Sequence, residues 1–146
     1  MISYSSNSSE FGFLPVYPNT TENGLNPSDT VSTGYSAITT LSGAVTVTPA
    51  QLVSGVISHD PNGGGVTSTL PTAADLIKAM RSSAGTGFYV SYHNTADAAE
   101  VITIAGGSGM TMHGTFTIAR NKIRNLLVIQ KNSTEVDVFS LGELDK

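Results

Sequence analysis

The chain contains neither cysteine nor tryptophan, and its 146 residues include only 11 acidic and 7 basic side chains. Without cysteine it has no disulfide framework and no thiol chemistry, so the sequence does not indicate a redox compartment. No apolar run reaches 18 residues, and no apolar signal-peptide core follows Met1. We therefore expect a soluble protein that has no membrane partner and no export signal of its own.

Lysine and arginine are absent from residues 1–77, which hold five acidic residues. All seven basic residues lie in 78–146, together with the other six acidic residues. A net charge of −4 with an acidic first half argues against nucleic acid as the main partner. The sparse charge and the many Ser and Thr residues suit a chain that is covered by neighbouring proteins.

Residues 1–36 are predicted to form an extended N-terminal arm, because they are rich in Ser, Thr, Asn, Gly and Pro. Such a segment cannot fold alone, since ordering the backbone costs about 1–2 kcal/mol per residue. Arms of this kind either stay disordered or become ordered against a partner. Pro15 and Pro18 favour an extended conformation for the arm's apolar cluster. We expect this cluster to anchor the arm, and its members are Phe11, Phe13, Leu14, Val16 and Tyr17.

Residues 37–146 are predicted to form one domain of short β-strands. Apolar and polar residues alternate in runs that are separated by turn sequences every 8–12 residues or so. This spacing predicts an all-β fold, an antiparallel β-sandwich of jelly-roll type. The predicted strands are 43–48, 56–58, 66–70, 88–93, 101–105, 110–112, 115–119, 123–130 and 136–141.

Two short helices are predicted from capping signals. Thr48 precedes a proline and has Gln51 three residues later, a capping-box pattern for a helix of at most two turns. Thr72 and Asp75 mark the start of a second helix near 73–82.

One predicted strand is apolar on both faces, which requires cover on both sides. The run consists of Leu126, Leu127, Val128 and Ile129. One face is expected to meet the core, and the other is expected to contact a second subunit or the arm. The alternative is a central strand that is covered by a helix such as 73–82.

The three histidines, His59, His93 and His113, show no metal-binding or catalytic spacing, and we interpret them as surface or loop residues. His59 and Asp60 are neighbours on a strand, so their side chains should point to opposite faces and form no relay. Asp97 and Glu100 lie in a turn with no sign of a substrate cleft. We therefore expect no enzyme activity, no metal and no cofactor.

The glycine-rich run at 60–65 lacks the ligands of a calcium loop and the lysine of a phosphate loop, so it is predicted to be a turn. Arg120, Lys122 and Arg124 alternate, so in an extended segment they would share one face. We interpret them either as a solvated edge or turn, or as a contact to an acidic surface such as a neighbour's arm.

Three stretches together resemble a known structural module: AQLVSGVISHDPNGGGVTSTLPTAADLI at 50–77, NTADAAEVITIAGGSG at 94–109 and VFSLG at 138–142. They resemble a β-sandwich module of tailed-bacteriophage and large-DNA-virus structural proteins, used in capsid decoration, head fibres or tail parts. Such modules are similar to the trimeric jelly rolls that cap capsid three-fold sites. The resemblance covers residues 49–142 and carries no catalytic residues.

The resemblance implies a capsid decoration (cement) protein on the virion exterior, assembled in the host cytoplasm. Its partners would be the major capsid protein and two further copies of the chain. The alternative is a receptor- or carbohydrate-binding head, since jelly rolls also host lectins. A hydrolytic enzyme is a third and weaker reading. Tyr89 and Tyr92 lie beside Phe88 on a strand, where we expect them to serve the core rather than a sugar site.

Overall fold

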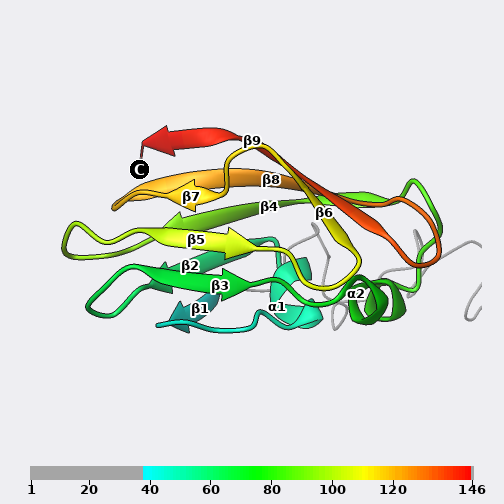
Figure 1. Ribbon diagram of the computed structural model, residues 1–146, viewed down its shortest axis with the longest axis horizontal. Helices are drawn as coiled ribbons and strands as arrows, with labels where there is room; N and C mark the ends of the chain where they lie inside the picture. The colour runs from blue at the N-terminus through cyan, green and yellow to red at the C-terminus, as the bar shows by residue number, and fades with distance from the viewer. Residues whose placement is uncertain (1–37, 146) are drawn as a thin grey trace, which may run out of the picture. The chain divides into compact units, whose positions relative to one another are not determined.

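Two β-sheets of unequal size face each other in the computed structural model, which describes residues 38–145 (Figure 1). The larger sheet contains, in spatial order, β1 (Thr39–Ser42), β2 (Val56–Asp60), β4 (Gly87–Asn94), β8 (Lys122–Gln130), β9 (Val136–Asp145) and β6 (Met110–His113). The smaller sheet contains β3 (Val66–Thr69), β5 (Ile102–Ala105) and β7 (Thr117–Ile118). The expectation of a β-sandwich domain is therefore confirmed.

The prediction that the strands would pair antiparallel is wrong for most of them. Four of the seven strand pairs are parallel: β1 with β2, β2 with β4, β3 with β5, and β6 with β9. The other three pairs, β4 with β8, β5 with β7 and β8 with β9, are antiparallel. Both sheets are therefore mixed.

The parallel pairs arise because the chain alternates between the two sheets. β2 is followed by β3 in the other sheet, and β4 is followed by β5, so that two successive turns of chain stack side by side. β1 starts a similar turn, in which Thr46 forms an isolated parallel bridge to Thr69. We call residues 39–105 the parallel coil. The strands β8 and β9 then form an antiparallel pair, the β8–β9 hairpin, which is joined to β4 of the coil.

The strand expected at 43–48 is not present. β1 lies earlier in the chain, at Thr39–Ser42, and only Thr46 keeps an isolated bridge. Gly43 has a φ of 67°, a left-handed conformation that glycine adopts at little cost and that ends β1. Alternation of side chains therefore indicated an extended segment correctly but did not locate its strand partner.

Both helices begin where their capping signals predicted. In α1 (Pro49–Val53) the Thr48 hydroxyl accepts from the Gln51 amide, and the Gln51 side chain accepts from the Thr48 amide. In α2 (Ala73–Met80) the Thr72 hydroxyl accepts from the Asp75 amide at 3.1 Å. The two helices contact each other beyond the C-terminal end of β3 (Figure 1). Within residues 38–145, neither helix is long or apolar enough to cross a bilayer.

A single hydrophobic core lies between the sheets and includes residues from both of them and from the helices. Burial of these side chains is the main source of stability, at about 1.5–3 kcal/mol for each large one. Its fully or nearly fully buried members include Leu52, Ile57, Leu76, Val90, Ile102, Ile104, Ile118, Leu126, Val128 and Val138.

Candidate interaction face

The outer face of the larger sheet carries apolar side chains that the described residues leave partly exposed. Along β8, Leu126 and Val128 are fully buried in the core, whereas Leu127 and Ile129 alternate with them on the outer face and are half-buried. The prediction that all four form a subunit contact is therefore corrected, because the core takes up Leu126 and Val128. Only Leu127 and Ile129 remain available on the outer face.

The strand register places two aromatic residues beside Leu127. Tyr89 on β4 and Phe139 on β9 are its direct cross-strand partners. Tyr89 is 60% exposed, so the expectation that it serves the core is wrong, whereas Tyr92 is fully buried as expected. Cross-strand neighbours on one face lie about 4.5–5.5 Å apart, so these side chains form one continuous row.

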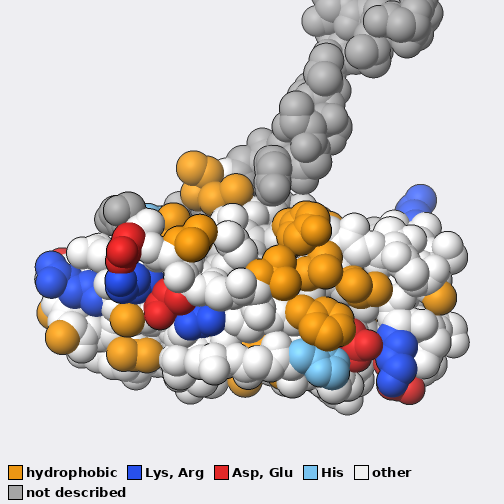
Figure 2. Space-filling view, turned by 90° about the horizontal axis from the view of Figure 1, so that it is seen from above, with side chains coloured by type: hydrophobic (Ala, Val, Ile, Leu, Met, Phe, Trp, Pro, Cys, Tyr) orange, Lys and Arg blue, Asp and Glu red, His pale blue; other side chains and the backbone are white. Residues whose placement is uncertain are grey.

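The row continues to β6, where His113 is the cross-strand partner of Phe139. The two rings stack nearly parallel, with centroids 4.5 Å apart and planes inclined by 11°. His113 Nε2 also lies 3.3 Å from the Asp137 carboxylate, which is on the same face of β9. Figure 2 shows hydrophobic side chains gathered on one face of the described residues, with a histidine and a few charged groups at their edge.

The row gains further apolar area at the end of β9. A bulge opposite Asn125 and Leu126 adds one residue to β9, and Leu141 at this point is 53% exposed. Leu144, the partner of Ile123, is 54% exposed. We call the set Tyr89, Leu127, Ile129, Phe139 and Leu141 the apolar face.

The alternative cover for β8, the helix near 73–82, is not found on this face. α2 places its buried residues, Ala73 and Leu76, in the core between the sheets. Just beyond α2, Ser82 donates to the side chain of Gln130, which is on the inner side of β8. Among the described residues, nothing lies over the apolar face as a helix would.

The three alternating basic residues do not share one face. Asn121 has a φ of 59°, which turns the chain between Arg120 and β8. Arg124 is buried and holds the sheets together, because it donates to the Thr117 carbonyl and pairs with Glu143. The prediction of a common basic surface is therefore wrong for Arg124.

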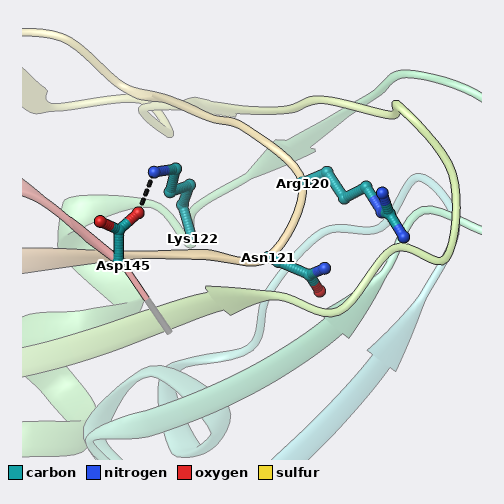
Figure 3. Close-up of a pocket in the computed structure, with 4 residues that line it drawn as sticks. All are labelled: Arg120, Asn121, Lys122 and Asp145. Atoms are coloured by element: carbon teal, nitrogen blue, oxygen red, sulfur yellow. Dashed lines mark hydrogen bonds and ion pairs between the residues drawn. The ribbon is translucent and has the colours of Figure 1, made fainter.

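Arg120, Asn121, Lys122 and Asp145 line an open hollow near the end of β9 (Figure 3). Lys122 forms an ion pair with Asp145, and this hydrogen bond raises the pKa of Lys122 and lowers the pKa of Asp145. Arg120 extends away from this pair in Figure 3 and its Nε donates to the Ala96 carbonyl at 3.4 Å. The lysine of this hollow is therefore paired with a carboxylate of the same chain.

His59 is fully buried, so its interpretation as a surface or loop residue is wrong. Its Nε2 lies 2.7 Å from the Gly43 carbonyl, and its Nδ1 lies 2.9 Å from the Tyr92 hydroxyl. A carbonyl can only accept, so Nε2 carries the proton and Nδ1 accepts from Tyr92. Burial lowers the pKa of His59, against smaller opposing effects of the Gly43 hydrogen bond and of Asp60. Because this group is sealed in the core, it holds three segments of the coil together rather than meeting a substrate.

Asp97 and Glu100 do not act as a pair. Asp97 is exposed, whereas Glu100 is nearly buried, and its Oε1 accepts from the backbone amides of Gly63 and Gly64. Within 38–145, no group of three or more acidic or histidine side chains is arranged to hold a metal ion. Both Glu100 and His59 therefore have structural roles in the described residues.

Sequence reasoning missed Tyr89, Phe139 and Leu141 as members of the apolar face. These residues join the face because β4 and β9 flank β8 in the sheet. The sequence does not show which strands are neighbours or in what register they pair, so it held no signal for them. The predicted anchor residues, Phe11, Phe13, Leu14, Val16 and Tyr17, lie outside the described residues.

No protein-family model matches the chain, and neither a curated protein nor a solved structure matches it significantly.

Proposed function

We propose that this chain is a virion structural protein, a capsid decoration (cement) protein that binds the capsid surface as a trimer and is anchored by its N-terminal arm. The observation that carries the proposal is the apolar face. A sheet face with an aromatic–aliphatic row and few charges is typical of a surface that another protein covers. The resemblance of residues 49–142 to virion modules indicates which proteins these would be.

The apolar face supports association of the chain with copies of itself. Full burial of a Leu, Ile or Phe side chain contributes about 1.5–3 kcal/mol, so Leu127, Ile129, Phe139 and Leu141 offer a substantial driving force. Much of this free energy is offset by the cost of ordering the chains on association. Three equivalent contacts nevertheless form a closed ring in which every apolar face is covered. Three-fold symmetry is the choice that the resemblance to capsid-capping trimers favours.

The arm supports attachment to the capsid. Its apolar cluster has two Phe, a Leu, a Val and a Tyr between residues 11 and 17, which could contribute on the order of 5–10 kcal/mol gross when buried. An extended peptide of this kind can lie in a groove or add to the edge of a sheet. Three arms on one trimer act together, so that even weak individual binding gives firm attachment.

We propose a likeness to jelly rolls in the β-sandwich architecture and not in the strand topology. The resemblance implies a jelly-roll topology, whereas the parallel coil departs from an all-antiparallel arrangement. A shared mode of association does not need identical strand connections, because it depends on the exposed face.

Deletion of residues 1–35 tests the proposal. We expect the truncated protein to fold and to keep its oligomeric state, since all described strands remain, but to be lost from capsids in a co-sedimentation assay. A matched pair in the full chain sharpens the result: Phe13→Ser should reduce capsid occupancy, whereas Val31→Ser, outside the cluster, should not. Unchanged occupancy after the deletion would mean that attachment lies on the sandwich.

A second candidate, a carbohydrate-binding head, gains support from Tyr89. Sugars commonly stack on exposed aromatic rings, and Tyr89 is 60% exposed on the apolar face. Binding to a glycan array that is abolished by Tyr89→Ala, with the trimer intact, would favour this function over the first.

A further inference from the structure

The glycine-rich loop between β2 and β3 contains the dipeptide Asn62–Gly63, and both residues are exposed. Asn62 has a φ of 60° and Gly63 a φ of 96°, so the chain turns sharply here. Asparagine followed by glycine is chemically labile, because glycine has no side chain to shield its backbone nitrogen. The loop thus exposes a dipeptide that is prone to spontaneous deamidation.

Deamidation at this dipeptide is a reaction with water alone. The backbone nitrogen of Gly63 attacks the side-chain carbonyl carbon of Asn62, and the new N–C bond closes a five-membered succinimide. The bond to the side-chain nitrogen breaks, and ammonia leaves with the proton that the Gly63 amide has lost. Water then opens the ring at either carbonyl and leaves aspartate or isoaspartate at position 62.

The structure places a carboxylate on the atom that must react. Glu100 Oε1 lies 3.0 Å from the Gly63 nitrogen and 3.1 Å from the Gly64 nitrogen, and it accepts a hydrogen bond from each. Hydrogen bonds to a charged acceptor are stronger than those between neutral groups. The attacking nitrogen is therefore held in a fixed direction with its proton engaged.

Glu100 is itself held firmly. Only 9% of its surface is exposed, and its carbonyl accepts from the side chain of the fully buried Asn94 at 2.9 Å. Next to it, the Val101 carbonyl accepts from the Val66 amide at 3.0 Å. The hydrogen bonds of Glu100 to Gly63 and Gly64 therefore join two successive loops of the parallel coil, the β2–β3 loop and the β4–β5 loop.

We propose that Asn62–Gly63 is a latent deamidation site and that Glu100 protects it in the folded protein. Attack on Asn62 requires the Gly63 amide to leave the carboxylate, lose its proton and rotate toward the side chain. The two hydrogen bonds to Glu100 oppose each of these steps. Deamidation thus requires the loop to open, and its rate reports the frequency of opening. This inference is independent of the proposed virion function.

Peptide mapping by mass spectrometry tests the proposal on the full chain, incubated at mildly alkaline pH with and without urea. We expect Asn62 in the native protein to deamidate at least about tenfold more slowly than in urea, because the loop seldom opens. Glu100→Ala removes the shared acceptor of two hydrogen bonds and should accelerate native deamidation by about tenfold. Asp97→Ala is the matched control. It removes an exposed carboxylate from the β4–β5 loop, which also carries Glu100, and it should leave the deamidation rate unchanged.

Glu100→Gln serves as a second variant in case Glu100→Ala does not fold. Its neutral amide oxygen can still accept, so its deamidation rate should fall between those of the wild type and of Glu100→Ala. Equal rates in native and urea-treated wild type would overturn the proposal. It would also be overturned if removal of the Glu100 carboxylate slowed deamidation, since the carboxylate would then act as a base that promotes the attack.

Discussion

The parallel coil and the β8–β9 hairpin belong to one sandwich but differ in the side chains that they bury and expose. In the coil, His59, Ser68 and Asn94 are buried with no exposed surface, and each makes a hydrogen bond to another segment. The hairpin buries aliphatic residues such as Val128 and Val138, together with the polar residues Arg124 and Gln130, and it also has apolar residues on its outer face.

The difference follows from how the strands of each region are joined. Parallel strands cannot be joined by tight turns, so the coil depends on contacts between successive loops, and its buried polar groups provide them. The hairpin is held mainly by nine paired positions along β8 and β9, and its buried Arg124 adds a hydrogen bond to the Thr117 carbonyl of the smaller sheet. We therefore assign the proposed contact with another protein to the outer face of the hairpin, and a scaffold role to the coil.

The largest effect is expected at Gly107, just after the parallel coil, where the chain packs against the coil's own backbone. A Cβ on Gly107 would lie 2.2 Å from the Pro71 carbonyl oxygen and 2.6 Å from that of Leu70, and backbone atoms cannot yield. Gly107→Ala should lower the free energy of unfolding by about 3 kcal/mol or more. Gly64→Ala, in the coil loop with no atom within 4 Å of its Cβ, should change it by less than about 0.5 kcal/mol. Urea unfolding of both variants checks this, and equal losses would contradict the close packing of Gly107 against Leu70 and Pro71.

A paired asparagine substitution compares the two regions directly. The Asn94 side chain donates to the carbonyls of Glu100 and Ile118 and accepts from the Ala96 amide. Asn94→Ala leaves these buried groups unpaired and should cost about 3 kcal/mol. Asn125→Ala in the hairpin removes only a bond from the Ser91 hydroxyl and should cost about 1 kcal/mol or less. The same urea titration measures both, and a larger loss for Asn125→Ala would reverse the comparison.

The pH dependence of stability should come from the coil. Burial lowers the pKa of His59 from 6.5, so below pH 6.5 the unfolded chain binds a proton that the folded chain does not. Stability is therefore present above 6.5 and is lost as the pH falls, by at most about 1.4 kcal/mol per pH unit. His59→Gln should remove this slope between pH 7 and 5. Urea unfolding across this pH range measures it, and a slope that persists unchanged in His59→Gln would contradict the assignment to His59.

A smaller change in stability is expected at alkaline pH, and it comes from Tyr92, the hydrogen-bond partner of His59. Burial raises the pKa of Tyr92 from 10.0 to about 12. The unfolded chain releases this proton first, so stability is complete below pH 10 and falls as the pH rises toward 12. A tyrosinate absorbance titration should show a late-ionising component, and Tyr92→Phe should remove that component.

Local signals in the sequence predicted the elements well. Thr48 with Gln51 and Thr72 with Asp75 marked both helix starts, because capping depends on residues three positions apart. Most strands were found by alternation, which is also local. The parallel partners were missed because pairing depends on where the chain goes between strands. β1 was missed because the run at Thr39–Ser42 has one buried apolar residue, Leu41, and shows no alternation.

The candidate site was predicted only in part. The sequence showed that the run around Leu127 is apolar on both faces, but it did not tell which residues face inward. Phe139 and Tyr89 follow from the register with β8, and His59 is buried because Gly43 and Tyr92 come to it from distant positions. Such contacts between distant parts of the chain are not visible in residue spacing.

The central claim is that the apolar face of the hairpin joins copies of this chain, and the molar mass in solution tests it most directly. Sedimentation equilibrium at micromolar concentration should give three times the mass of one chain for the wild type. Leu127→Asp places a charge in the middle of the face and should give a monomer with an unchanged circular dichroism spectrum. Thr103→Asp, at the matching half-buried position on the central strand of the smaller sheet, should remain a trimer. A monomeric wild type, or a trimer that persists in Leu127→Asp, would contradict the claim.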